Sequence, residues 1–113
     1  MIKLTVLVKR RAGLSVEEFH EHWREHGRMI AGEPDLRRHI ARYEQHHRSI
    51  ADYQTGGDTY DGLVLQWYER FADFLAFLND PKYAELVQPD EQRLLDMDSI
   101  VVLFTDEAET FIP

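Results

Sequence analysis

Alternation of apolar and polar positions predicts strands at the start, middle and end of the chain. In Ile2–Lys9 every second residue is isoleucine, leucine or valine, which is the period of a strand with one buried face. Leu63–Glu69 and Ser99–Thr105 are short segments rich in β-branched, aromatic and other apolar residues, and they are predicted as strands too. A further strand is predicted over Arg38–Arg48, although the early part of this segment also fits a helix.

A helical period follows the first strand. Ser15 and Glu18 have the spacing of a capping box, in which each side chain satisfies a backbone N–H of the other, so a helix is predicted to begin at Ser15. It should end near Gly32–Asp35. Its apolar stripe contains Val16, Phe19, Trp23, His26 and Ile30.

The rest of the chain supplies a glycine-bearing loop and more helix. Tyr53–Gly62 is predicted as the loop. The segment between Glu69 and Pro81 repeats apolar residues with a helical period, and prolines begin two short helical pieces after it, at Pro81 and Pro89.

The order strand, helix, strand, strand, helix, strand is typical of a ferredoxin-like α+β domain with a four-stranded antiparallel sheet. At 113 residues the chain fits a single domain, residues 1–113. Helices would cover one face of the sheet, yet the last strand carries apolar residues in both phases. A second copy of the sheet is the simplest cover for the other face, so we expect a homodimer.

Composition narrows the class of partner. The formal charge of −8 argues against nucleic acid, which binds clustered basic surfaces. The chain has no cysteine, so thiolate catalysis and cysteine-based metal sites are excluded. The apolar start is too short to span a bilayer and no cleavage site follows it, so we expect a cytoplasmic protein without a membrane partner.

Three blocks in order resemble the EthD family of the dimeric α/β-barrel superfamily. They are "KRRAGLSVEEFHEHWREHG", "RHIARYEQHH" with "YDGLVLQWYERFADF", and "PDEQRLLD". The resemblance implies a cavity between sheet and helices in each subunit, with no obligatory cofactor. It also leads us to expect an acid near Leu65, where this chain is apolar. Relatives by fold include cyclases, dehydratases, decarboxylases, cofactor-free monooxygenases and haem-handling enzymes, and fold alone does not choose among them.

Geometry separates the histidines of the first helix. On a wheel of about 100° per residue, His26 lies within the stripe, His22 about 60° from Phe19, and His20 about 100° away and therefore in solvent. His26 is either a buried histidine with backbone partners or a general base, and the resemblance favours the base. The four-residue spacing of His22 and His26 also occurs in metal sites, but the zinc signature would need glutamate where Trp23 stands, so no metal is expected.

On the predicted second strand, Tyr43 and His47 share one face. That face looks either towards the helices or into the dimer interface. In the first case His26, Tyr43 and His47 form the catalytic group, and the substrate-binding residues are predicted to be Phe19, His22, Trp23, Trp67 and Tyr68. Asp90 and Glu91 are interpreted as capping acids of a short helix, with contact to the site as the alternative.

Such a pocket suits proton transfer on a flat, apolar carbonyl compound. The sequence therefore predicts a cofactor-independent lyase or cyclase for an aromatic or polyketide-like substrate, working through an enolate. A cofactor-independent monooxygenase acting on a phenol or anthrone and a non-catalytic module that binds a small ligand are the alternatives.

Overall fold

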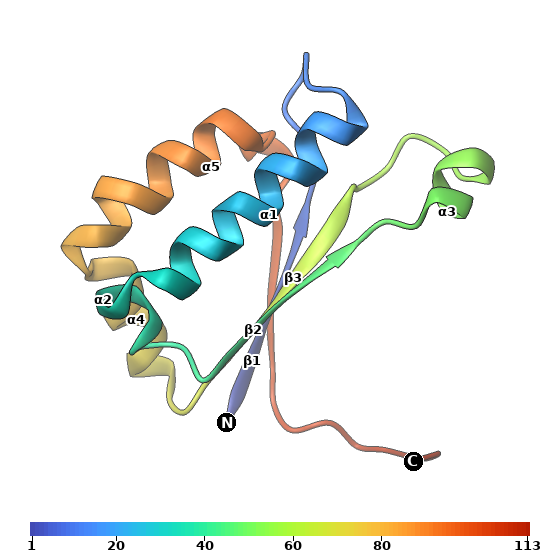
Figure 1. Cartoon of the computed structure of the whole chain (residues 1–113). Coiled ribbons are helices and arrows are strands. Elements are labelled where there is room, and N and C mark those ends of the chain that lie inside the picture. Colours follow the sequence, from blue (N-terminus) through green and yellow to red (C-terminus); the bar gives the residue numbers. More distant parts are fainter.

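A single antiparallel sheet of four strands organises the computed structural model, which describes residues 1–113 (Figure 1). The strands lie in the order β2-β3-β1-β4, so the first strand is central and the last lies at an edge. This order confirms the predicted ferredoxin-like α+β fold. The strand bounds are β1 (Ile2–Val8), β2 (Arg42–His47), β3 (Gly62–Tyr68) and β4 (Val101–Thr105).

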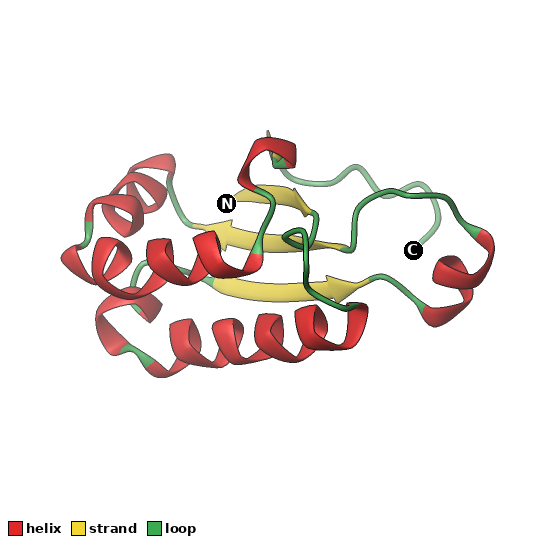
Figure 2. Cartoon of the chain, turned by 90° about the horizontal axis from the view of Figure 1, so that it is seen from above, coloured by secondary structure: helices red, strands yellow, loops and turns green.

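The main helices cover one face of this sheet, and α3 stands apart at the end where β2 leads out (Figures 1 and 2). None of the helices is both long enough and apolar enough to cross a bilayer. The helical elements are α1 (Val16–Gly32), α2 (Pro34–Arg37), α3 (Ile50–Thr55), α4 (Phe71–Asn79), the π-helical turn η1 (Tyr83–Val87), α5 (Gln88–Leu94) and the 3₁₀ turn η2 (Met97–Ser99).

The capping box at the start of α1 is present as predicted. The Ser15 hydroxyl accepts the Glu18 N–H at 3.0 Å, and the Glu18 carboxylate accepts the Ser15 N–H at 3.1 Å. Phe19 and Trp23 on the inner side of the helix are 0% and 1% exposed. Burying a side chain of this size contributes roughly 1.5–3 kcal/mol, so the stripe holds α1 on the sheet.

Two predicted boundaries were wrong. The second strand begins at Arg42 and not at Arg38, because Pro34–Arg37 forms a helical turn whose first N–H groups are capped by Glu33. The first residues of the predicted loop Tyr53–Gly62 instead form the end of helix α3, whose cap is the Ser49 hydroxyl accepting the Asp52 N–H at 3.1 Å. Both errors came from caps that local periodicity does not reveal.

Strand register divides the side chains between two faces. Leu4 pairs with Gln66 and Val6 with Val64, and these rows look towards the helices, where they line the core and a cavity. Tyr43 pairs with Gln66 and therefore lies on this inner face. The face that carries Tyr43 and His47 thus looks towards the helices, which was one of the two alternatives left open by the sequence.

The outer face of the sheet carries an apolar patch that no other element of the chain covers. Thr5 pairs with Leu65 and Leu103, which puts all three in one row. Leu103 is 60% exposed. The patch consists of Leu7, Leu63, Leu65, Trp67, Val101 and Leu103.

Candidate active site

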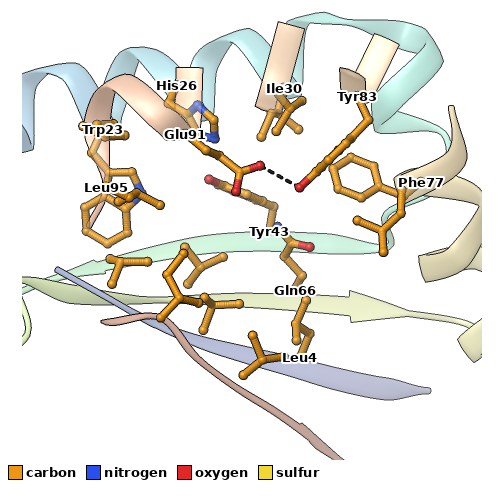
Figure 3. A pocket seen from close by; sticks show the side chains of 18 of the residues that line it. Leu4, Trp23, His26, Ile30, Tyr43, Gln66, Phe77, Tyr83, Glu91 and Leu95 are labelled. Atoms are coloured by element: carbon orange, nitrogen blue, oxygen red, sulfur yellow. Dashed lines mark hydrogen bonds between the residues drawn. The ribbon is translucent and has the colours of Figure 1, made fainter. Parts of the chain in front are cut away.

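A cavity of about 290 Å³ lies between the helices and the inner face of the sheet (Figure 3). Of its 20 lining residues 17 are hydrophobic, and the three others are His26, Gln66 and Glu91. The Tyr43 and Tyr83 side chains add two phenols to the same lining. A few polar groups in an apolar cavity are typical of a small-molecule site.

His26 is held by a carboxylate from another helix. Its Nδ1 lies 2.6 Å from Asp90 Oδ2, while the second oxygen of Asp90 lies 2.7 Å from His22 Nε2. Burial by itself would raise the pKa of Asp90, but the hydrogen bonds from the two histidines outweigh it and hold that pKa below the usual value. Asp90 is therefore ionised at neutral pH and accepts a hydrogen bond from each imidazole.

The remaining nitrogen of His26 has no partner in the chain. An ionised Asp90 requires the hydrogen on Nδ1, which leaves Nε2 as the basic nitrogen of the neutral ring. Nε2 has no hydrogen-bond partner in the chain, and every fully buried polar side-chain atom does have one, so Nε2 keeps some accessible surface. His26 lines the cavity, where Figure 3 shows its ring above Glu91 and Tyr43. The arrangement can accept a proton from a bound molecule.

A carboxyl and a phenol form a second pair across the cavity. Tyr83 donates its hydroxyl to Glu91 Oε1 at 2.7 Å (Figure 3). Burial is the largest cause that raises the pKa of Glu91 above its usual value, and the nearby Asp90 charge adds to it. A carboxyl group with a raised pKa holds its proton more readily and can serve as an acid.

Tyr43 lies on the sheet side of the cavity. Burial raises the pKa of Tyr43 to about 12, so the phenol stays protonated. Gln45 donates through Nε2 to the Tyr43 oxygen at 3.2 Å and to the Trp23 carbonyl at 2.7 Å. Gly27 allows this approach, because a Cβ there would lie 2.7 Å from Gln45 Nε2.

The structure brings three of the predicted site residues to the cavity, namely Trp23, His26 and Tyr43. Phe19 and Tyr68 are both 0% exposed and belong to the packed core beside the cavity. They therefore support the lining without forming part of it.

The other predicted residues lie elsewhere. His22 reaches the site only through Asp90. Trp67 lies on the outer face, because it pairs with Lys3 and Arg42 in an outward-facing row, and both of these cations approach its ring. His47 is on the inner face but contacts Gln45 and His20 and does not line the cavity.

The placement of His20 in solvent was wrong. It is 8% exposed, with Nδ1 2.6 Å from His47 Nδ1 and Nε2 2.8 Å from the Tyr53 hydroxyl. Tyr53 belongs to α3, the helix that occupies the start of the predicted loop. No three His, Asp or Glu side chains in the chain are grouped so as to hold a metal ion.

Sequence reasoning gave Asp90 and Glu91 the wrong main role. Both do lie in the first turn of α5, but neither provides a cap there, and their side chains reach His26 and Tyr83 instead. Tyr83 and Gln66 were missed altogether. In the sequence, the only sign of the contact between Asp90 and His26 was that an acidic segment follows the helix with the histidines.

The fold and site define a ferredoxin-like α+β domain with a carboxylate-held histidine at an apolar cavity. The EthD domain family matches residues 11–98, and the chain belongs to that family. The predicted resemblance is therefore confirmed.

Solved structures with a similar fold are distant in sequence. A dimeric protein of unknown function from Bacteroides fragilis is 16% identical, with 94% of this chain and 95% of that chain covered and a TM-score of 0.70. Hydroxynitrile lyase from Passiflora edulis is 18% identical (98% and 96% covered, TM-score 0.64). An antibiotic biosynthesis monooxygenase is 12% identical (96% and 100% covered, TM-score 0.62). At these identities the likeness shows the fold alone. No curated protein matches the chain.

Proposed function

We propose that the chain is a cofactor-independent lyase or cyclase that acts on an aromatic or polyketide-like carbonyl compound through an enolate. The observation that carries this proposal is the Asp90–His26 hydrogen bond of 2.6 Å, which leaves Nε2 of His26 free at an apolar cavity. Asp90 holds the ring in one orientation and one tautomer, and it stabilises the imidazolium that forms when Nε2 takes a proton.

In this mechanism His26 Nε2 removes a proton from the carbon next to the substrate carbonyl. Tyr43, still protonated because burial raises its pKa to about 12, donates a hydrogen bond to the developing enolate oxygen. The imidazolium of His26 then returns the abstracted proton to a departing hydroxyl or to the product carbon, while Glu91 accepts the Tyr83 hydroxyl at the cavity wall. His47 contributes only through Gln45 and does not touch the substrate.

The shape of the lining supports a flat apolar substrate. A volume of about 290 Å³ is at the lower end of small-molecule sites, and the aromatic side chains of Trp23, Tyr43 and Phe77 can pack against a ring. The chain offers no cationic lining residue for a phosphate or carboxylate group.

The working unit of this proposal is a homodimer formed through the outer face of the sheet. In the single chain Val101 and Leu103 of the apolar patch are exposed and its other residues are half-buried, so a second copy would remove their remaining apolar surface from water. The similar Bacteroides fragilis protein is described as dimeric, which supports the same assembly here.

Exchange of carbon-bound hydrogen tests the base separately from the later steps of the reaction. A panel of aromatic and polyketide-like ketones is incubated with the protein in D₂O, and loss of the α-proton signal is followed by NMR. His26→Ala and Asp90→Asn should each slow exchange about 10²–10⁴-fold while the fold is retained, because each disables the general base. His46→Gln is the matched control, since His46 is 52% exposed in its side chain and lies on the opposite face.

Each outcome of the panel decides between function classes. Exchange that needs His26, followed by loss of water, carbon dioxide or ring closure, supports the proposal. Consumption of oxygen with a phenol or anthrone points to the monooxygenase. Binding of the panel compounds without exchange at any pH overturns the enzyme assignment in favour of a binding module.

A further inference from the structure

A second polar network lies beside the cavity, and Tyr43 is its only member that takes a direct part in the mechanism above. It begins at the Tyr43 oxygen on the cavity side and ends at a carboxylate that is 1% exposed. Its members, in order, are Tyr43, Gln45, His47, His20, Tyr53 and Asp61.

At the Gln45 end of the network, the amide oxygen must accept a hydrogen bond. The Gln45 nitrogen donates to the Trp23 carbonyl, which can only accept, so the amide has a single orientation. Its oxygen therefore faces His47 Nε2 at 3.0 Å. His47 must carry a hydrogen on Nε2 to make this contact.

At the other end of the network, the Asp61 carboxylate must also accept a hydrogen bond. The backbone N–H of Arg10 and its Nη1 each lie 2.7 Å from the Asp61 carboxylate. Burial alone would raise the pKa of Asp61, but these contacts and the Tyr53 hydroxyl lower it, so the group is ionised. Tyr53 donates to Asp61 at 2.6 Å, and its oxygen must then accept from His20 Nε2 at 2.8 Å.

The network needs one more hydrogen than its neutral side chains hold. Both imidazoles need a hydrogen on Nε2, yet their Nδ1 atoms also lie 2.6 Å apart, which is a hydrogen-bond distance and too close for two bare nitrogens. The four contacts from Gln45 to Asp61 need four hydrogens. Two neutral imidazoles and one phenol supply three.

We propose that the His20–His47 pair binds one proton from solvent, holds it between the two Nδ1 atoms, and acts through Gln45 to position and polarise the Tyr43 hydroxyl. The charge on the pair strengthens the His47 donation to the Gln45 oxygen, and this makes the Gln45 N–H a stronger donor to Tyr43. Because the Tyr43 oxygen accepts from Gln45, its own hydrogen is left to point at a ligand. The effect on turnover rests on the proposed function, whereas the proton binding does not.

The surroundings set the pH range of this event. Burial is the largest influence and lowers the pKa of both rings, for His47 to about 4. Repulsion from the His20 ring lowers the pKa of His47 further, Arg24 on α1 lowers both pKa values, and Arg10 lowers that of His20. Asp61 and Glu17 raise the pKa of His20. The shared proton is therefore taken up on the acid side of an ordinary imidazole and is lost as the pH rises towards neutrality.

Imidazole ¹⁵N NMR between about pH 3 and 8, without substrate, tests the proton count. We expect the His20 and His47 rings to titrate together with one common midpoint and the uptake of one proton per chain, with the two Nδ1 signals moving and both Nε2 nitrogens remaining protonated. Two independent midpoints, or a bare Nε2 on either ring at the acid end, would overturn the proposal.

Tyr53→Phe sharpens the test because it removes one hydrogen and two contacts. The two remaining contacts from Gln45 to His20 need only two hydrogens, which the neutral rings supply, so the variant should bind the proton at least about tenfold more weakly. Tyr60→Phe is the matched control, because its hydroxyl takes part in no hydrogen bond of the chain, and it should keep the wild-type midpoint. Equal midpoints in Tyr53→Phe and wild type would contradict the count.

The link to Tyr43 has its own readout. The Tyr43 ring signals should shift with the same midpoint as the histidines in the wild type, and this shift should vanish in Gln45→Leu. If the Tyr43 ring signals of the wild type do not change across the histidine titration, the positioning role of the His20–His47 pair is refuted. Neither result depends on turnover, so failure of the proposed reaction leaves this test intact.

Discussion

Replacement of Gly62 by alanine probes the contact that sets the distance between α1 and the sheet. A Cβ at position 62 would lie 2.6 Å and 2.7 Å from Cζ3 and Cη2 of Trp23, and 2.5 Å from the His46 carbonyl oxygen. Comfortable contacts between carbon atoms begin at about 3.5 Å, so the indole would have to retreat by roughly 1 Å. The His46 carbonyl belongs to the backbone and the Trp23 indole is a rigid, fully buried ring, so moving either one costs free energy.

The size of the effect follows from these contacts. Overfilling a packed core costs about 1–3 kcal/mol, and two rigid neighbours place Gly62→Ala in the upper half, at about 2–3 kcal/mol. An unfolding entropy of about 2.1 cal/mol/K per residue means that 1 kcal/mol corresponds to roughly 4 °C for a chain of this length. The melting temperature should therefore fall by about 8–12 °C.

Calorimetry at a fixed protein concentration measures the change, since dimerisation would make the melting temperature depend on concentration. Gly32→Ala is the control, because a Cβ at the last residue of α1 meets nothing within 4 Å. It should leave the melting temperature unchanged or raise it slightly, through the higher helix propensity of alanine. An unaltered melting temperature in Gly62→Ala would refute the close approach of Trp23 to β3.

Three further perturbations have defined outcomes. Glu91→Gln keeps an acceptor for Tyr83 and removes a buried charge. Because the pKa of Glu91 is raised in the folded state, the variant should gain about 1.4 kcal/mol of unfolding free energy at pH 7 for each unit of pKa shift removed. In urea titrations this gain should disappear below about pH 4.3, where Glu91 is protonated in both states. A gain that is independent of pH would contradict the buried charge. Leu65→Arg in the outer patch should convert a dimer to monomers in light scattering, whereas Glu21→Arg, on the exposed side of α1, should not. Ser15→Ala should lower the free energy of unfolding by about 1 kcal/mol through loss of the α1 cap. An unchanged free energy of unfolding in urea titrations would show that the capping box is dispensable.

The site was predictable where a local period decided it. The wheel put His26 on the buried stripe of α1, and strand alternation put Tyr43 and His47 on one face, as the structure has them. The same rule failed for Trp67, because β3 is apolar in both phases and its inner row contains the polar Gln66. Periodicity cannot choose a face when both look buried.

Contacts between distant segments decided the rest. Asp90 lies 64 residues beyond His26 in the chain and meets it only because α5 packs beside α1. His20 points away from the stripe, yet the far end of β2 and the short helix α3 enclose it. The spacing of residues along the chain identifies neither the partner of His26 nor that of His20.

The sequence by itself determined the order of the four strands and the main helices, the start of α1 and the stripe that carries His26, because each of these depends on residues within a few turns of one another. Only the tertiary structure decided that His26 has a carboxylate and His20 a second imidazole as partner. Those pairings require segments far apart in the chain to pack at hydrogen-bond distance. A local sequence pattern cannot predict such a distance, because it describes only residues that are neighbours along the chain.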